Sequence, residues 1–170
     1  MKWIKLNSTY GYEDFINTEF QDFLNSWAIN NLYLFDDNGA FRKFCILDNC
    51  INFPHQIINY LKQKIIKFEK ITDWKPEPIF KDYIGINFKG GSIHTHKDVN
   101  DGKYIHTRYN IITSYPEKGG ESLYGDYVNV LKEKIVWKCI AGKIPHGSKE
   151  VLSDKPRITL SLGFLIRNNE

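Results

Sequence analysis

The chain has 170 residues, of which 42% are hydrophobic and 25% are charged. This length is typical of one domain with a single core, and the composition favours a folded globule over a disordered segment. Lys and Arg total 23 against 20 acidic residues, and the formal net charge of +3 is too small to indicate a nucleic-acid or membrane partner through bulk attraction.

We therefore expect a single folded domain over residues 1–170. Three cysteines, Cys45, Cys50 and Cys139, form no Cys-x-x-Cys pair, which favours a reducing compartment where thiols stay free. No stretch approaches the roughly 18 apolar residues of a membrane span, and the first residues lack the apolar core of a signal peptide. These features predict a cytoplasmic protein without a membrane partner, and they carry no signal for an oligomeric state.

Residues 1–78 are predicted to form a mainly helical support region. Apolar residues recur at helical spacing over 16–27, and Glu13 and Asp14 precede them, where a helix N-terminus favours negative charge. A short run rich in apolar residues over 41–47 indicates a strand.

A second helix is expected after this strand. Asn52 is predicted to cap it, Pro54 occupies its tolerated first turn, and apolar residues repeat on one face over 57–68. The opposite face, which we expect to be solvated, carries Lys62, Lys64, Lys67 and Lys70. Two prolines within 74–78 then end the helical pattern, because each restricts the residue before it.

The second half of the chain is predicted to be rich in β-structure. Short apolar runs alternate with glycine-containing turns and predict strands over 80–88, 106–115, 135–140 and 157–166. Helices that come first and strands that come later predict an antiparallel sandwich or barrel backed by two helices.

His96 and Asp98 are two residues apart, so in an extended segment their side chains point to the same face. A lone His-x-Asp is common, and a metal site would need a third ligand. His94 alternates with His96 and would share that face, but a His94–His96 pair would leave Asp98 without a role. We therefore favour His96 with Asp98.

His146 supplies the third candidate ligand, just beyond an apolar strand that contains Trp137. Two histidines and one carboxylate on one side of an octahedral ion leave three positions open, which suits iron(II) that must also bind a co-substrate and oxygen. Zinc usually takes a closed tetrahedral set. Considered alone, His146 is better explained as an ordinary loop histidine, so the prediction depends on the three residues together.

Arg157 begins a run in which polar and apolar residues alternate, so that Arg157, Thr159 and Ser161 share one face. An unpaired buried guanidinium is costly, and its planar fork can bind a carboxylate through two hydrogen bonds. We therefore expect a barrel whose interior holds a charged ligand on Arg157. The alternative is that Arg157 pairs with Asp98 or Glu150.

Together these residues resemble the iron(II)- and 2-oxoglutarate-dependent dioxygenase superfamily, particularly its prolyl-hydroxylase-like branch, over about residues 83–166. The matching segments are Asn87 to Ile93 leading into His96-Lys97-Asp98, Arg108-Tyr109-Asn110 with Gly119-Gly120-Glu121, Trp137 to His146, and Arg157-Ile158-Thr159. The resemblance implies a double-stranded β-helix, a cupin-like jelly roll, as the catalytic core over residues 79–170. It also implies that His96, Asp98 and His146 bind iron and are the catalytic residues.

The resemblance further implies that Arg157 binds the distal carboxylate of the co-substrate 2-oxoglutarate, with Thr159 and Tyr115 assisting. Relatives often carry a co-substrate tyrosine upstream of the His-x-Asp turn, where this chain has Asn87 and Phe88. The implied reaction consumes oxygen, releases succinate and carbon dioxide, and hydroxylates an amino acid that is free or part of a peptide or protein.

Other interpretations of the sequence remain open. The fold could serve a non-catalytic module that binds a small carboxylate or sugar, or a nucleic-acid demethylase, although the slight basic excess disfavours the latter. Because Asp98 is present, the resemblance implies hydroxylation rather than halogenation. His106 and Arg108 either line the substrate mouth or reflect ordinary sheet polarity, and His55 is predicted to be structural.

Overall fold

The computed structural model describes residues 2–6, 9–129, 131 and 133–168 of the chain. The strands are β1 (Lys2–Lys5), β2 (Tyr10–Glu13), β3 (Asp36–Asp37), β4 (Arg42–Ile46), β5 (Trp74–Pro76), β6 (Tyr83–Asn87), β7 (Ile93–His96), β8 (Tyr104–Ser114), β9 (Ser122–Tyr124), β10 (Tyr127–Asn129), β11 (Val136–Cys139), β12 (His146–Ser148) and β13 (Arg157–Arg167). The α-helices are α1 (Thr18–Asn30) and α2 (His55–Glu69), and short 3-10 helices cover Leu32–Leu34 and Leu47–Asn49.

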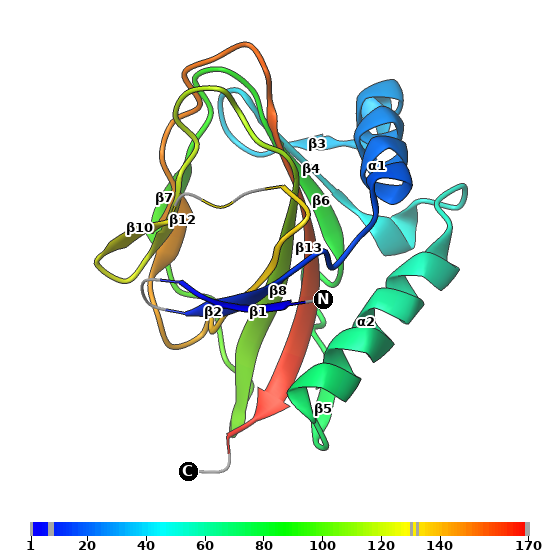
Figure 1. Cartoon of the computed structure of the whole chain (residues 1–170), viewed down its shortest axis with the longest axis vertical. Coiled ribbons are helices and arrows are strands. Elements are labelled where there is room, and N and C mark those ends of the chain that lie inside the picture. The colour runs from blue at the N-terminus through cyan, green and yellow to red at the C-terminus, as the bar shows by residue number, and fades with distance from the viewer. Residues whose placement is uncertain (1, 7–8, 130, 132, 169–170) are drawn as a thin grey trace.

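The strands form two antiparallel sheets on opposite sides of a barrel (Figure 1). The larger sheet follows the order β1-β2-β11-β8-β13-β6-β4-β3, with β5 paired to the end of β13, and the smaller sheet follows the order β10-β9-β12-β7. The prediction of a mainly β chain with an antiparallel barrel and N-terminal helices is confirmed.

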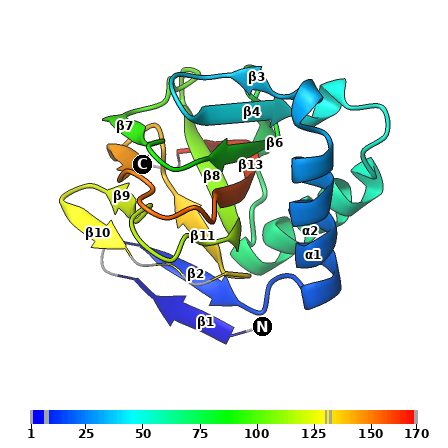
Figure 2. The same cartoon turned by 90° about the horizontal axis from the view of Figure 1, so that it is seen from above.

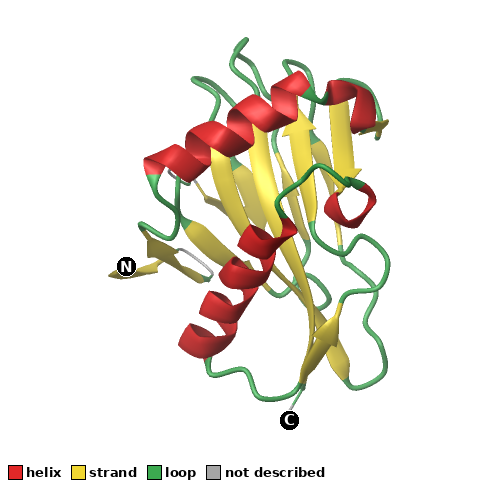
Figure 3. Cartoon of the chain, turned by 90° about the vertical axis from the view of Figure 1, so that its right-hand side faces the viewer, coloured by secondary structure: helices red, strands yellow, loops and turns green. Residues whose placement is uncertain are grey.

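Both α-helices lie against the outer face of the larger sheet (Figure 2 and Figure 3). Alternate residues of β13, such as Leu160 and Phe164, are fully buried in the same core cluster as Leu24 of α1 and Leu61 of α2. Each such side chain stabilises the fold by about 1.5–3 kcal/mol relative to an exposed one. The intervening residues of β13 therefore face the barrel interior.

The start of α1 corrects one expectation. The helix begins at Thr18 because the side chain of Asn17 accepts a hydrogen bond from the backbone N–H of Phe20 at 2.9 Å. Glu13 is instead the last residue of β2, and Asp14 has a φ of 53°. The prediction that these two acids begin the helix is wrong, since an Asn three residues later provides the stronger start signal.

The second helix corrects two further expectations. It begins at His55, and no side chain caps it, so the predicted cap by Asn52 is wrong. The predicted solvated lysine face is wrong for Lys62, which is 8% exposed and whose Nζ lies 3.0 Å from both carboxylate oxygens of Asp82. Lys64 also turns inward and donates to the carbonyl of Phe15 at 2.7 Å. Both lysines find oxygen partners that are distant in sequence.

Residues 1–78 also contribute strands to the larger sheet. β2 pairs with β11, β4 pairs with β6, and β5 pairs with the end of β13, where Pro76 lies opposite Phe164. These strands have three to five residues, so only β4 gave a recognisable apolar run. The division into a support region and a core at residue 78 stays a prediction.

Among the described residues, no helix has the length and apolarity needed to cross a membrane.

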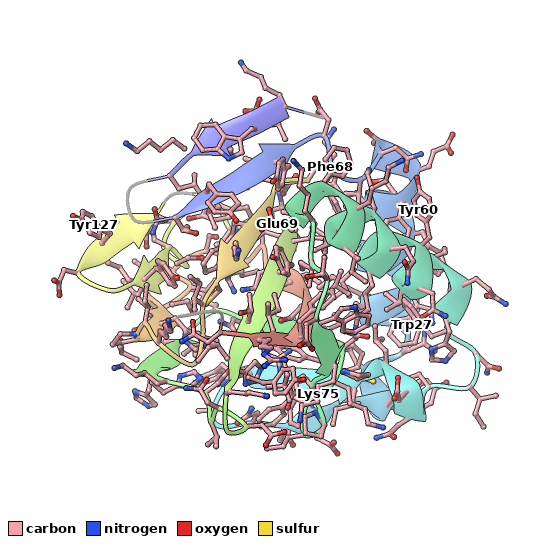
Figure 4. The ribbon with its side chains drawn as sticks, turned by 90° about the horizontal axis from the view of Figure 1, so that it is seen from below. Trp27, Tyr60, Phe68, Glu69, Lys75 and Tyr127 are labelled. Carbon is pink, nitrogen blue, oxygen red and sulfur yellow. The ribbon has the colours of Figure 1, made fainter. Side chains whose placement is uncertain are left out.

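A partly buried polar cluster connects the end of α2 to the sheet, beside the β1–β2 hairpin (Figure 4). The Glu69 carboxylate accepts hydrogen bonds from the hydroxyls of Tyr10 at 2.5 Å, Tyr12 at 2.7 Å and Tyr109 at 3.0 Å, and from Lys138 Nζ at 3.0 Å. Burial raises the pKa of Glu69, but the hydrogen bonds from Tyr10, Tyr12 and Lys138 more than offset it, and the pKa is lowered overall. We call this set of five residues the Glu69 cluster.

Candidate metal centre

Strands β7 and β12 place two histidines side by side. His146 lies directly opposite His96 in the antiparallel pairing, and the two ring centroids are 4.4 Å apart. Asp98 follows β7, and its backbone N–H donates to the carbonyl of Ala141 at 2.9 Å, which fixes the chain there. One ligand atom from each of His96, Asp98 and His146 lies within 4.8 Å of the others, as a shared metal ion requires.

The imidazoles are oriented so that the same nitrogen of each faces Asp98. His96 Nε2 lies 3.4 Å from Asp98 Oδ1, and His146 Nε2 lies 3.9 Å from Asp98 Oδ2. Their Nδ1 atoms lie 2.7 Å and 3.3 Å from the carbonyls of His94 and Ile144. A neutral imidazole that donates from Nδ1 to a carbonyl keeps the lone pair of Nε2 for a metal.

The electrostatics of the cluster favour an ionised aspartate. Burial raises the pKa of Asp98, but its hydrogen bond to His96 and the charges of His106, Arg108 and His146 hold that pKa well below its usual range. The hydrogen bond to Asp98 raises the pKa of His96, whereas burial lowers the pKa of His146. An ionised carboxylate beside imidazoles is a donor set for a divalent transition metal.

Two buried residues of β8 lie close to the Asp98 carboxylate. Arg108 Nε and His106 Nε2 each lie 3.5 Å from Asp98 Oδ2. Arg108 also donates from Nη2 to Glu77 Oε2 at 2.9 Å, and its guanidinium lies 4.8 Å from the ring centroid of Tyr83. Because His106 and Arg108 are each 3% exposed, neither is an ordinary polar residue of a solvated sheet face.

A cavity of about 150 Å³ opens beside this cluster, between the two sheets. The predicted site residues that line it are His96, Asp98, His146, Arg157 and Thr159. His94 and Tyr115 are not part of its lining. The pairing of β7 with β12 is irregular between His146 and Ser148, and this irregularity interrupts the regular alternation that would give His94 the face of His96.

Arg157 lies in the cavity wall, and no acidic side chain in the described part of the chain forms an ion pair with it. It is 5% exposed, its Nη2 donates to Ser122 Oγ at 2.9 Å, and its Nε has no hydrogen-bond partner among the described residues. Burial lowers the pKa of Arg157 to about 10. The alternative pairing with Asp98 or Glu150 does not occur among the ion pairs of the described residues.

The two residues predicted to assist Arg157 differ in position. Thr159 lines the cavity, and its buried Oγ1 has no hydrogen-bond partner among the described residues. Tyr115 has a buried hydroxyl that also lacks a partner there, and burial raises its pKa. Its positive neighbour Arg157 opposes that shift, so the two side chains are close, but a contact of Tyr115 with the co-substrate stays a prediction.

Several cavity residues were not found from the sequence. Arg42 pairs with Asn87, which pairs with Arg157, so the three form one row across β4, β6 and β13. Tyr83 of β6 lines the same cavity, four residues before Asn87. Period-two alternation places Arg42 and Phe44 on one face of β4, but which face meets the cavity depends on the pairing of β4 with β6.

Comparison with known proteins identifies similar folds. No family model matches the chain, and no curated protein matches it. A prolyl-4-hydroxylase from Pseudomonas putida superposes with a TM-score of 0.64 at 11% identity, over 94% of this chain and 92% of that chain. HygX from Streptomyces hygroscopicus, solved with nickel and 2-oxoglutarate bound, gives a TM-score of 0.71 at 10% identity, over 92% and 82%.

A third similar structure is a prolyl hydroxylase from Trichoplax adhaerens in complex with a peptide fragment of a hypoxia-inducible factor. Its TM-score is 0.67 at 11% identity, over 92% of this chain and 82% of that chain. At these identities the likeness establishes the architecture of the chain. The predicted double-stranded β-helix is confirmed, and the chain has the fold of 2-oxoglutarate- and iron(II)-dependent oxygenases.

Proposed function

We propose that this protein is an iron(II)- and 2-oxoglutarate-dependent oxygenase. His96, Asp98 and His146 would hold the iron, and Arg157 would bind the distal carboxylate of 2-oxoglutarate, with Thr159 beside it. The observation that carries the proposal is the pairing of a three-ligand cluster with an uncompensated, buried guanidinium in the wall of the same cavity. A buried charge without a partner is costly unless a ligand supplies the partner.

The residues present fit both groups. Two imidazoles and one carboxylate leave three positions of an octahedral ion for other ligands, which is the donor set of non-haem iron(II) oxygenases. Arg157 and the free Oγ1 of Thr159 offer a fork and a hydroxyl to a carboxylate across the cavity. Tyr83 and Tyr115 are further candidates for co-substrate contacts, Tyr83 from within the cavity lining.

Iron(II), once bound with 2-oxoglutarate and oxygen, supplies the oxidative decarboxylation to succinate and carbon dioxide and the transfer of one oxygen atom to a substrate C–H bond. The protein's own residues would bind the iron and the co-substrate and orient them. Arg108 and His106 lie beside Asp98 and favour its ionised form, while Glu77 neutralises Arg108. Trp137 and Phe44 in the cavity lining exclude water from the reacting groups.

The test is anaerobic titration of the protein with iron(II) and 2-oxoglutarate, followed by visible absorption. We expect the metal-to-ligand charge-transfer band of a chelated 2-oxo acid in the wild type and in Lys97→Ala, which changes an exposed neighbour of the ligands. Asp98→Ala should lose the band together with iron binding. A wild-type protein that binds iron but gives no band with 2-oxoglutarate would contradict the proposal.

The proposed substrate is an amino acid, free or within a peptide or protein, and the reaction is hydroxylation. One similar structure holds a peptide, which supports the peptide form of this class. A screen of amino acids and peptides for stimulated succinate release tests the class. The non-catalytic alternative predicts that Asp98→Ala leaves carboxylate binding unchanged, so the same variant separates the two. A cytoplasmic location and the absence of a nucleic-acid partner stay predictions.

A further inference from the structure

Arg42 is a second guanidinium in the wall of the cavity. It lies in the same row as Asn87 and Arg157, on neighbouring strands that are about 4.8 Å apart, so the Cα atoms of Arg42 and Arg157 are separated by roughly 10 Å. Both arginines line the cavity that His96 and His146 also line.

The side-chain contacts of Arg42 differ from those of the other arginine of the cavity lining near Asp98, Arg108. Among the described residues Arg42 forms no ion pair, and its buried Nε has no hydrogen-bond partner. The contrast with Arg108 is direct, because Arg108 contacts both Glu77 and Asp98. Among the described residues of the cavity lining, Asp98 is the single acid, and it already serves Arg108 and the two histidines.

The backbone before Arg42 holds it in a fixed position. Phe41 has a φ of 60°, a left-handed conformation that is unfavourable for a side chain of this size, and its carbonyl accepts a hydrogen bond from Phe88 N–H at 2.8 Å. A Cβ on Gly90 would lie 2.9 Å from the Phe41 ring, and one on Gly91 would lie 2.5 Å from the Phe41 carbonyl oxygen. Gly90 and Gly91 thus leave space for Phe41, whose backbone conformation places Arg42 at the cavity.

The charges of the loaded site leave Arg42 without a partner. If the proposed function holds, a divalent iron and Arg157 carry three positive charges, and Asp98 and the 2-oxoglutarate dianion carry three negative charges. Arg108 is neutralised by Glu77. Arg42 is partly exposed but its Nε is buried, so an anion that comes from neither the protein nor the co-substrate would give this guanidinium a charged partner.

We propose that Arg42 binds a carboxylate or phosphate group of the primary substrate, an inference that depends on the proposed function. Phe44, two residues along the same strand, lines the same cavity together with Phe80, and their ring centroids are 6.1 Å apart. Phe80 is 40% exposed and so lies at the mouth. The substrate class is a small acid whose apolar part packs against these two rings while its oxyanion lies on Arg42.

The first test uses protein loaded with nickel(II) and saturating 2-oxoglutarate, so that Arg157 is already occupied. Acetate and inorganic phosphate are titrated separately by calorimetry, and the tighter of the two identifies the preferred oxyanion. We expect Arg42→Gln to weaken that binding by roughly tenfold or more, because a charge-assisted bidentate contact is lost. Lys43→Gln is the matched control, since Lys43 is the next residue of the strand and pairs with Asp37 outside the cavity.

The second test measures succinate release with the free amino acids and with the corresponding α-carboxamides, in which a neutral amide replaces the carboxylate. The acids should stimulate release more strongly than the amides. Arg42→Gln should raise the KM for the best acid by roughly tenfold, while the KM for the co-substrate stays within about twofold of the wild-type value. Arg42→Lys should recover part of the loss.

The outcomes separate this inference from the proposed function. An intact charge-transfer band in Arg42→Gln shows that the variant is folded and that iron and 2-oxoglutarate bind as proposed. If that band is intact but anion binding by Arg42→Gln equals that of wild type, or wild type binds neither anion, the inference is overturned and the proposed function survives. A change confined to the KM for the co-substrate would likewise overturn it, because Arg42 would then serve 2-oxoglutarate.

Discussion

The carboxylates of Glu69, at the end of α2, and Asp98, after β7, have very different surroundings. Glu69 receives four hydrogen bonds of 2.5–3.0 Å from three tyrosines and a lysine. Asp98 is surrounded by two imidazoles, a further histidine and an arginine, at distances of 3.4–3.9 Å. The first set of distances lies within hydrogen-bond range, and the second lies mostly at or beyond its limit.

The difference separates a structural cluster from one that is arranged for a ligand. The Glu69 cluster satisfies its carboxylate completely, so its members stabilise each other and the end of α2. The Asp98 cluster leaves its donor atoms apart, with space for an ion between them. Short, saturated contacts therefore predict an effect on folding, whereas long, unsaturated contacts predict an effect on metal binding.

The largest effect should follow removal of a metal ligand. We expect His96→Ala to weaken iron(II) binding by roughly a hundredfold or more, beyond the loss that an outer-shell partner typically causes. His94→Ala, on the same strand but outside the cavity lining, is the control and should bind iron as wild type does. Anaerobic titration measures both, and an equal loss in the two variants would favour the alternative histidine pair.

The next largest effect concerns folding of the metal-free protein. Glu69→Gln should lower the free energy of unfolding by about 2–3 kcal/mol, because it leaves a partly buried lysine and three tyrosine hydroxyls without an anionic acceptor. Asp98→Asn should also destabilise the fold, because the lowered pKa of Asp98 favours its ionised form in the folded protein, but the loss should be smaller because Arg108 keeps Glu77 as its partner. Urea unfolding of both variants measures the two values, and the reverse order would refute the comparison.

Acid should reduce the contribution of Glu69 to folding. The pKa of Glu69 is lowered in the folded protein, so its stabilisation is complete above the ordinary value of about 4.3 and is lost as pH falls through the lowered value. The difference in unfolding free energy between wild type and Glu69→Gln should stay constant above about pH 5 and narrow below about pH 4. A difference that grows in acid would contradict the lowered pKa.

The smallest effect should come from one member of the Glu69 cluster. Tyr12→Phe removes a single hydroxyl whose hydrogen bond to Glu69 is 2.7 Å long, and it should cost about 1 kcal/mol of unfolding free energy. Tyr33→Phe provides the control, because Tyr33 is 79% exposed and should change stability very little. Iron affinity should be the same in both variants.

Much of the fold could be predicted where the pattern is long. The run over 157–166 alternates regularly, and the strand observed there is Arg157–Arg167. Strands β9, β10 and β12 have three residues each, which is too short for a period to be recognised, and all three were missed. Lys62 was assigned to solvent because its partner Asp82 comes from another element, 20 residues away.

The residues of the candidate site also differ in how well the sequence predicts them. His96, Asp98, His146 and Arg157 could be selected because their residue types and order form a recognisable set, and the structure brings all four to one cavity. Arg42 belongs to no such set. Its inward direction depends on which face of β4 meets the barrel, and that choice is made by pairing with β6 and by packing of Phe41 against two glycines.

His96 and His146 lie directly opposite each other on β7 and β12. These residues belong to two short strands, of four and three residues, in the sheet on the side away from both α-helices (Figure 1 and Figure 2). An ion bound by both histidines, and by Asp98 in the following loop, would link β7 and β12, whose backbone pairing is short and irregular. Local fluctuations of the smaller sheet should therefore be damped by metal, while those of the helix-backed sheet change little.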